Sequence, residues 1–449
     1  MDNNAPTQFL HAFSGILNGL RLYPPQHPAI LTLHKTLWDS LQNLLMQCQQ
    51  KITFGVIDET LFIGNQLYTD GTPAAETLAK QLEQLQIEGI EITTGLQHEQ
   101  LRDFIELFNQ GKLRGQTFDE TLNQKGISNI RHIQRDGGDS AGNMARKTYD
   151  HAKNIIQEVS RDVRNGQVPR TEQVVTSVDK MVRQIVKTPY AMLALNMIKD
   201  YDDYTYAHSV NVSVLALTIG RSCQLDAESL NILGMGSLLH DLGKLKIAPY
   251  IIKKPGRLTP PEYEEVKLHP ELGAKIAQEM DDIDPRAIDI ILSHHLHYDR
   301  CGYPSTALAK IHSELVDIAT VADTYDAMTT LRAYHRPRTP RQAINIMQRL
   351  SGSQLHPHYL KHLEQTLGPF PVGSLVRLVS NEIGLIVDMD PLNRENSTIR
   401  IVKNKAGNNI DTPYDHQLSN SSHTIAGEVD PLTHNINISS LLSLVLYQH

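Results

Sequence analysis

The stretch SLLHDLGKLKI at residues 237–247 carries a histidine, a carboxylate and a lysine within an apolar run. His240 and Lys244 are four residues apart and Asp241 and Lys244 are three apart, so on a helical turn their polar groups lie near one face. Elsewhere such a trio would be an ordinary solvated patch. Because its neighbours are apolar, we expect it to lie against the core, where unpaired charges are costly unless they bind something.

Other histidines and aspartates recur around this stretch at intervals of roughly 30 residues. In a helical bundle one helix and its connection take roughly 15 residues, so such a gap returns the chain to the same end of the bundle two helices later. We therefore expect seven side chains to converge on one pocket: His208, His240, Asp241, His269, His294, His295 and Asp323.

Imidazole and carboxylate donors in this proportion suit a borderline first-row metal better than Mg²⁺ or Ca²⁺, which prefer oxygen ligands. Two ions are more natural than one, because a single tetrahedral ion uses only about four protein ligands. The competing interpretation of each histidine by itself is a hydrogen-bonded surface or core residue, which is the commoner role of a lone histidine. The string HDLGK at 240–244 favours the metal site.

The rest of the chain divides by its hydrophobic pattern. Helical periodicity dominates residues 145–367 and predicts one all-helical domain. Residues 1–136 combine amphipathic helices with short β-rich runs and predict an α/β input or docking domain, and the Gly- and Ser-rich residues 137–144 predict a linker. Residues 368–449 contain short β-forming runs separated by turn residues and predict a small β domain. The expected fold class is therefore a multi-domain, mainly α protein.

Composition excludes several classes of protein. The chain of 449 residues has a net charge of −8, so it lacks the general basic field that holds a nucleic acid polymer. No apolar run approaches the ~20 residues of a membrane span, and the N-terminus does not resemble a secretion signal. Cys48, Cys223 and Cys301 are odd in number and far apart, which argues against disulfides. We expect a reduced, cytoplasmic protein.

Five stretches resemble, in order and spacing, the HD-GYP family of metal-dependent phosphodiesterases that hydrolyse cyclic di-GMP. They are YTYAHSVNV (204–212), LLHDLGKLKI (238–247), KKPGRLTPPEYEEVKLHPELG (253–273), HHLHYDRCGYP (294–304) and VADTYDAMTTLRAY (321–334). The resemblance implies an HD-type helical bundle over about 145–367. Residues 368–387 are similar to the small β extension that often follows such domains.

The resemblance also implies the ligands of two metals, usually iron or manganese. The first metal would take His208, His240, Asp241 and Asp323, and the second would take Asp241 as a bridge with His269, His294 and His295. Relatives with a third metal use a glutamate four residues before the first histidine, where this chain has Tyr204. Two metals, and opening of the ring to linear pGpG, are therefore expected.

Two such ions would hold a hydroxide between them and clamp the phosphate for in-line attack. Asp241 would be catalytic as the bridge, and Lys244 would offset charge on the phosphoryl oxygens. By the resemblance, Tyr303 would stack on a guanine. The expected substrate-binding residues are Lys244, Arg300, Gly302, Tyr303, Pro304 and Arg332.

This chain departs from the family near the residues expected to bind the substrate, which we call the substrate rim. Leu296 stands where an acidic residue is usual, and Arg300 replaces a glycine. Arg300 would either contact a phosphate or disorder the loop, because a non-glycine residue in a left-handed conformation is strained. These departures leave an alternative open, a weak or inactive signalling module that binds cyclic di-GMP and metal and acts through partner contacts. An HD phosphohydrolase for another nucleotide is disfavoured by Gly302-Tyr303-Pro304 and Arg332.

The expected partners follow from this interpretation. Cyclic di-GMP is the expected substrate, and residues 1–136 are the expected contact for other signalling proteins. Self-association into a homo-oligomer stays open.

Overall fold

The computed structural model forms two compact units, of which the first takes Met1–Asp139, Ile401–Asp415 and Ser440–His449 and the second takes Ser140–Arg400 and His416–Ser439. The domain boundaries expected from the sequence remain a prediction. The structure describes residues 5–48, 50–57, 60–64, 66–68, 72–114, 117–133, 141–196, 204–254, 256–307, 313–330, 337–389, 397–418, 425–434, 436, 438 and 441–442.

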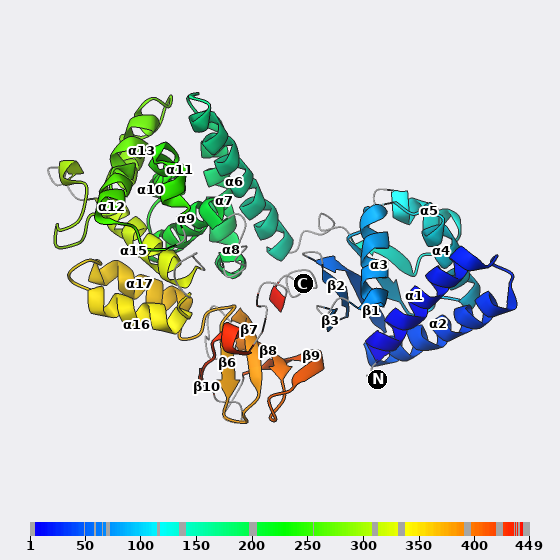
Figure 1. Cartoon of the computed structure of the whole chain (residues 1–449). Helices are drawn as coiled ribbons and strands as arrows, with labels where there is room; N and C mark the ends of the chain where they lie inside the picture. Colours follow the sequence, from blue (N-terminus) through cyan, green and yellow to red (C-terminus); the bar gives the residue numbers. More distant parts are fainter. Residues whose placement is uncertain are drawn as a thin grey trace. The chain divides into compact units, whose positions relative to one another are not determined.

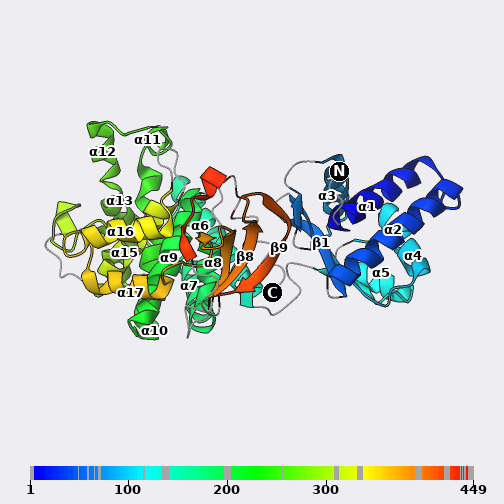
Figure 2. The ribbon, with the colours of Figure 1, turned by 90° about the horizontal axis from the view of Figure 1, so that it is seen from below.

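The N-terminal part is an antiparallel sheet packed with helices, in the strand order β3-β2-β1-β4-β5. Figures 1 and 2 show α1 and α2 side by side. The strands are β1 (Lys51–Ile57), β2 (Thr60–Ile63), β3 (Gln66–Tyr68), β4 (Gly89–Thr93) and β5 (Ile130–Ile133). The helices are α1 (Ala5–Leu22), α2 (Pro28–Gln47), α3 (Pro73–Gln84), α4 (His98–Asn109) and α5 (Phe118–Gln124).

A cluster of phenylalanines forms the centre of this α/β part. The ring of Phe13 on α1 is fully buried and lies 5.6 Å from the rings of Phe9, Phe54 and Phe108. These rings meet edge to face, the geometry that aromatic quadrupoles favour. The cluster joins helices α1 and α4 to strand β1, so it fixes how the helices cover the sheet.

Helices make up most of the second unit (Figure 1). They are α6 (Ala141–Arg164), α7 (Thr171–Lys187), α8 (Pro189–Asn196), α9 (Tyr204–Ser222), α10 (Ala227–Leu239), η2 (Leu242–Lys246), α11 (Pro249–Ile252), α12 (Pro260–Val266), α13 (His269–Gln278), α14 (Pro285–Ser293), η3 (Ser305–Ala307), α15 (Glu314–Thr329), α16 (Pro340–Leu350) and α17 (Pro357–Leu367). Helices α10 and α15 are buried along nearly their whole length, which is typical of helices at the centre of a bundle.

The predicted linker is helical in its second part. Helix α6 begins at Ala141, and residues 134–140 lie outside the described residues. The reason is the spacing of the buried residues Ala145, Tyr149 and Ala152, which gives the first turns of α6 a continuous face toward the core.

A second sheet follows the helices, in the strand order β10-β6-β7-β8-β9. Its strands are β6 (Leu375–Leu378), β7 (Ile383–Met389), β8 (Ser397–Lys403), β9 (Asn409–Gln417) and β10 (Ile425–Glu428), and a short helix η4 (Pro431–His434) follows. Strand β6 pairs antiparallel with β7 and with β10. The multi-domain, mainly α class with an N-terminal α/β part and a C-terminal sheet is thus the observed fold class. Among the described residues no helix has the length and apolarity to cross a membrane.

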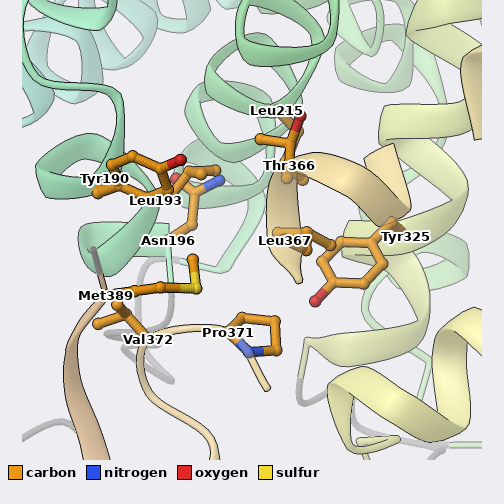
Figure 3. Close-up of a pocket in the computed structure, with 10 residues that line it drawn as sticks. All are labelled: Tyr190, Leu193, Asn196, Leu215, Tyr325, Thr366, Leu367, Pro371, Val372 and Met389. Atoms are coloured by element: carbon orange, nitrogen blue, oxygen red, sulfur yellow. The ribbon is translucent and has the colours of Figure 1, made fainter. Parts of the chain in front are cut away.

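Figure 3 shows a small cavity between these helices and the start of the second sheet. It is lined mainly by apolar side chains, including Leu193, Leu367 and Val372. The side chain of Tyr325 from α15 borders it (Figure 3). The cavity has a water-sized volume of about 20 Å³ and lies apart from the histidines predicted to form the site.

Candidate metal centre

The structure brings the seven predicted histidines and aspartates together at one place. They come from five different parts of the bundle: His208 from α9, His240 and Asp241 from the turn between α10 and η2, His269 from the start of α13, His294 and His295 from the end of α14, and Asp323 from α15. Their ligand atoms form three groups, each with all atoms within 4.8 Å of one another: His208 with His240 and Asp323, His240 with Asp241 and His294, and His269 with His294 and His295.

A glycine sets the distance between two of these segments. A Cβ atom at Gly243 would lie 1.9 Å from the carbonyl oxygen of His269 and 2.5 Å from the backbone nitrogen of Gly273. Only glycine therefore allows η2 to pack directly on the first turn of α13. This contact places Asp241, just before η2, beside His269.

Backbone carbonyls orient three of the imidazoles in the same way. The Nδ1–H groups of His240, His269 and His294 donate to the carbonyl oxygen three residues earlier, at 2.7, 2.7 and 2.9 Å. A carbonyl oxygen only accepts, so Nδ1 carries the proton and Nε2 is left with a lone pair. All three rings therefore direct an unprotonated Nε2 into the site.

Two of these lone pairs face each other. His269 Nε2 and His294 Nε2 lie 3.2 Å apart, yet two acceptor nitrogens cannot hydrogen-bond to each other. His240 Nε2 and Asp241 Oδ1 are also buried and make no hydrogen bond among the described residues. Buried acceptors that converge without donors are costly. A cation shared between them removes that cost, so the residues fit a bound metal.

His208 is held differently, by a carboxylate. Its Nδ1 lies 2.7 Å from Asp326 Oδ2. Its Nε2 lies 3.2 Å from Asp323 Oδ1 and 3.5 Å from Asp241 Oδ2. A histidine that binds a metal commonly donates its other N–H to a carboxylate, which fixes the tautomer and makes the ligand nitrogen more basic.

Asp326 and its partners were not identified from the sequence. Asn211 Nδ2 and Thr330 Oγ1 donate to Asp326 Oδ1 at 3.1 and 3.0 Å, and Tyr149 Oη donates to Asn211 Oδ1 at 2.6 Å. The available signal was spacing, because Asn211 follows His208 by three residues and Asp326 follows Asp323 by three. These side chains orient His208 from the side away from the centre.

Asp241 lies between the histidine groups. Its Oδ2 is 3.5 Å from His208 Nε2 and 3.4 Å from His240 Nε2, while its Oδ1 is 3.4 Å from His269 Nε2 and 4.0 Å from His294 Nε2. Lys244 Nζ donates to Oδ2 at 2.6 Å. One carboxylate thus presents one oxygen to each side, which is the arrangement that a bridging ligand requires.

The electrostatics favour neutral rings at His269 and His295, a protonated ring at His208, and ionised carboxylates at Asp241 and Asp323. Burial lowers the pKa of His269 to about 3, with Lys244 adding to the effect, and burial lowers the pKa of His295 to about 4. Burial also lowers the pKa of His208, but the carboxylates of Asp323 and Asp326 outweigh it and raise that pKa to about 9. Burial opposes ionisation of Asp241, yet His240 and Lys244 keep its pKa well below the usual value. Neutral imidazole and carboxylate are the forms that bind cations, so a metal ion at His208 Nε2 would displace the proton from that nitrogen.

The predicted substrate rim is only partly described. Tyr303 lies against the histidines, with its ring 4.7 Å from that of His295, and Gly302 has φ 120°, with a Cβ position 2.4 Å from the carbonyl oxygen of His295. Arg300 is exposed and has φ 67°, in the left-handed region. Leu296, in place of the usual acidic residue, is 2% exposed and packs in the core. Arg332 lies outside the described residues.

The segment that carries these side chains is similar to known proteins. Residues 192–358 match the family model described as HD domain. A cyclic di-GMP phosphodiesterase of Pseudomonas aeruginosa is 33% identical over 237 residues, which cover 53% of this chain and 57% of the relative. A cyclic di-GMP phosphodiesterase of Thermotoga maritima is 31% identical over 169 residues, which cover 37% of this chain and 46% of the relative.

A third relative differs in its named substrate. A 3′3′-cGAMP-specific phosphodiesterase of Vibrio cholerae is 29% identical over 168 residues, covering 37% of this chain and 36% of the relative. The chain spans about half the length of the curated relatives it matches. The matched segment contains the converging histidines and aspartates as well as Gly302-Tyr303-Pro304. Residues 192–358 of this chain therefore match the HD domain family, and they carry the motifs that resemble its HD-GYP members.

Proposed function

We propose that this protein hydrolyses cyclic di-GMP to linear pGpG with two divalent metal ions, iron or manganese. The observation that carries the proposal is the pair of unprotonated nitrogens, His269 Nε2 and His294 Nε2, 3.2 Å apart in a buried site. The names of the Pseudomonas and Thermotoga relatives support cyclic di-GMP as the substrate. Imidazole donors together with carboxylates favour a borderline transition metal over Mg²⁺.

The seven side chains would divide between two ions, with Asp241 shared by both. One ion would be held by His208, His240, Asp241 and Asp323, and the other by Asp241, His269, His294 and His295. Bound ions would polarise the phosphodiester and lower the pKa of the attacking water. Hydrolysis adds the oxygen of that water to phosphorus and breaks one bond from phosphorus to a ribose 3′ oxygen, which leaves as a hydroxyl.

Lys244 supports the reaction from the edge of the site. Its side chain is 23% exposed while that of Asp241 is 4% exposed, so the ammonium lies between the buried bridge and solvent. From this position Lys244 stabilises the ionised carboxylate of Asp241. The same charge also offsets the negative charge that develops on the phosphoryl oxygens.

The substrate would enter past Tyr303, whose phenol ring lies beside His295. We propose Arg300, Gly302, Tyr303, Pro304 and Arg332 as its further contacts.

The alternative function is a signalling module that binds cyclic di-GMP without useful turnover. It is favoured by Arg300, which is held at φ 67° in the loop that carries Tyr303. A non-glycine residue at such a φ costs on the order of 1 kcal/mol, enough to shift the loop.

The test is turnover by the full chain, purified under low oxygen and supplied with Fe²⁺ or Mn²⁺. We expect cyclic di-GMP to be converted to pGpG, separated by chromatography, and expect faster turnover than for 3′3′-cGAMP. Binding of cyclic di-GMP without turnover with either metal would establish the binding module instead. Faster hydrolysis of 3′3′-cGAMP would overturn the choice of substrate and leave the reaction class intact.

Two variants separate metal binding from charge stabilisation. Asp241→Ala removes the bridge, so we expect loss of hydrolysis together with at least one bound metal. Lys244→Ala should retain both metals and turn over more slowly. Lys246→Ala is the matched control, because Lys246 lies on the same short helix and directs its Nζ to the carbonyl oxygen of Val163, at 3.2 Å. Equal rates in Lys244→Ala and wild type would contradict the role of Lys244.

A further inference from the structure

A second group of metal-binding side chains lies outside the HD site. The ligand atoms of Cys223, His358 and His362 all lie within 4.8 Å of one another. Cys223 directly follows α9, and the two histidines stand on the first turns of α17. Cys223 is 15 residues beyond His208, which is roughly 20 Å along the helix. The group is therefore separate from the HD site.

The arrangement of the histidines follows from their spacing. His358 and His362 are four residues apart, so they lie on the same face of α17. Their ring centroids are 4.6 Å apart. Helix α17 packs on α9, which brings this face to the thiol at the end of α9. Two imidazoles and a thiol from two packed helices thus point to one place.

We propose that Cys223, His358 and His362 bind one zinc-class divalent cation, with water as the fourth ligand. One sulfur and two nitrogen donors match the tetrahedral preference of Zn²⁺, with distances of about 2.3 Å to sulfur and about 2.0 Å to nitrogen. At such distances the donor atoms would lie roughly 3.5 Å from one another. In this structure they lie within 4.8 Å of one another, so they must move slightly closer to hold the ion. His358 is exposed, so a small rotation of its side chain closes the site.

A serine holds one of these rings in place. Ser222 Oγ lies 2.8 Å from His362 Nδ1. With Nδ1 engaged by the serine, Nε2 is the nitrogen that remains for an ion. Hydrogen bonds of this kind on the far ring nitrogen orient the histidines of metal sites. The contact comes from the residue just before Cys223, so the end of α9 supplies one ligand and orients another.

The charges around the group also favour a cation. Burial raises the pKa of the Cys223 thiol to about 11, and the carboxylate of Glu314 adds to the effect. The same carboxylate accepts a hydrogen bond from Tyr359 Oη, at 3.2 Å, one residue after His358. Burial, and then His358, lower the pKa of His362, which keeps that ring neutral at pH 7. A divalent ion would offset Glu314 and displace the thiol proton to solvent, leaving a thiolate ligand.

The expected consequence is a link between two helices of the bundle. The cation would join the C-terminal end of α9, the helix that carries His208, to α17. Binding to the folded state alone stabilises a protein by mass action, so Zn²⁺ should raise the Tm of the full chain. The effect does not depend on turnover at the HD site.

Cobalt provides a readout that is specific for this site. A thiolate bound to Co²⁺ gives a near-ultraviolet charge-transfer absorption, whereas the seven HD-site residues offer only imidazole and carboxylate. Titration of the full metal-depleted chain with Co²⁺ should give this absorption, saturating at one thiolate-bound ion per chain. Cys223→Ser should abolish it. Cys48→Ser and Cys301→Ser are the matched controls and should retain it, because neither residue falls in a metal-binding group among the described residues.

Two further measurements distinguish loss of the metal site from misfolding of the Cys223→Ser variant. His358→Asn changes an exposed side chain and should weaken Co²⁺ binding at this site at least tenfold while leaving the far-ultraviolet circular dichroism unchanged. Zn²⁺ should slow alkylation of Cys223 by iodoacetamide, followed by mass spectrometry, in wild type and equally in Asp241→Ala. The proposal is overturned by absence of the charge-transfer band, by its persistence in Cys223→Ser, or by alkylation at the same rate with and without Zn²⁺.

Discussion

Gly243→Ala tests whether the contact between η2 and α13 sets the geometry of the metal centre. The new Cβ would lie 1.9 Å from the carbonyl oxygen of His269 and 2.5 Å from the backbone nitrogen of Gly273. Both obstacles are backbone atoms, which cannot rotate away as a side chain can. Contacts below 3.0 Å do not persist, so η2 and α13 must separate by about 1 Å.

This separation of η2 from α13 would change the position of Asp241, the proposed bridging residue, relative to His269. Asp241 Oδ1 and His269 Nε2 are now 3.4 Å apart, and they belong to the two segments that move. A misplacement of about 1 Å at a catalytic site lowers rates by about 100-fold. We therefore expect Gly243→Ala to reduce kcat by that order and to lose the ion of the His269 group before the ion of the His208 group.

The assay measures bound metal by elemental analysis after reconstitution with Mn²⁺ or Fe²⁺, together with single-turnover hydrolysis of cyclic di-GMP. Thermal unfolding of the same samples shows whether the bundle remains folded. Gly427→Ala is the control, because a Cβ at Gly427 meets nothing within 4 Å. Full activity with both metals in Gly243→Ala would refute the reasoning, since the close approach would then have no role in placing Asp241.

Four further changes test other parts of the structure. Asp326→Asn leaves His208 Nδ1 with a weaker acceptor, so metal affinity at the His208 group should fall about 10- to 100-fold, measured by competition with a chelator; unchanged affinity would contradict the orienting role. Arg300→Gly should lower kcat/KM for cyclic di-GMP about tenfold or more if the guanidinium contacts a phosphate, whereas an increase would show that strain at φ 67° dominates. Phe13→Ala removes a ring packed on four others and should lower the free energy of unfolding of the N-terminal part by about 3–5 kcal/mol in urea titrations, and a loss under 1 kcal/mol would be inconsistent with that packing. Burial lowers the pKa of His34 from 6.5 to about 4, so the unfolded chain binds the proton more tightly and stability should fall as the pH drops from 6.5 towards 4; His34→Leu should remove that part of the acid sensitivity, as followed by the midpoint of urea unfolding.

Much of the centre could be predicted from the chain because its chemistry is local in sequence. The HDLGK string places His240, Asp241 and Lys244 within one turn, and spacing near 30 residues returns the other ligands to the same end of a helical bundle. The helical and strand periodicities likewise predicted the fold class, because most elements bury one face, although the central helices α10 and α15 are buried on all sides. The roles of residues 1–136 and any self-association remain predictions.

The tertiary structure decided which neighbours each of the seven candidate ligands has. The packing of three helices brings Asp326 to His208, Asn211 to Asp326 and Tyr149 to Asn211. No local pattern states which side chain will accept the Nδ1 proton of His208. The group of Cys223, His358 and His362 arises in the same way, from two segments more than a hundred residues apart in sequence.

The sequence by itself therefore determined the donor types and the helices that carry them. Only the folded chain decided the distances, tautomers and partners. The physical reason is that helix formation and burial follow short-range periodicity, whereas the position of one side chain against another depends on close contacts between distant segments, such as that of Gly243 with the carbonyl oxygen of His269.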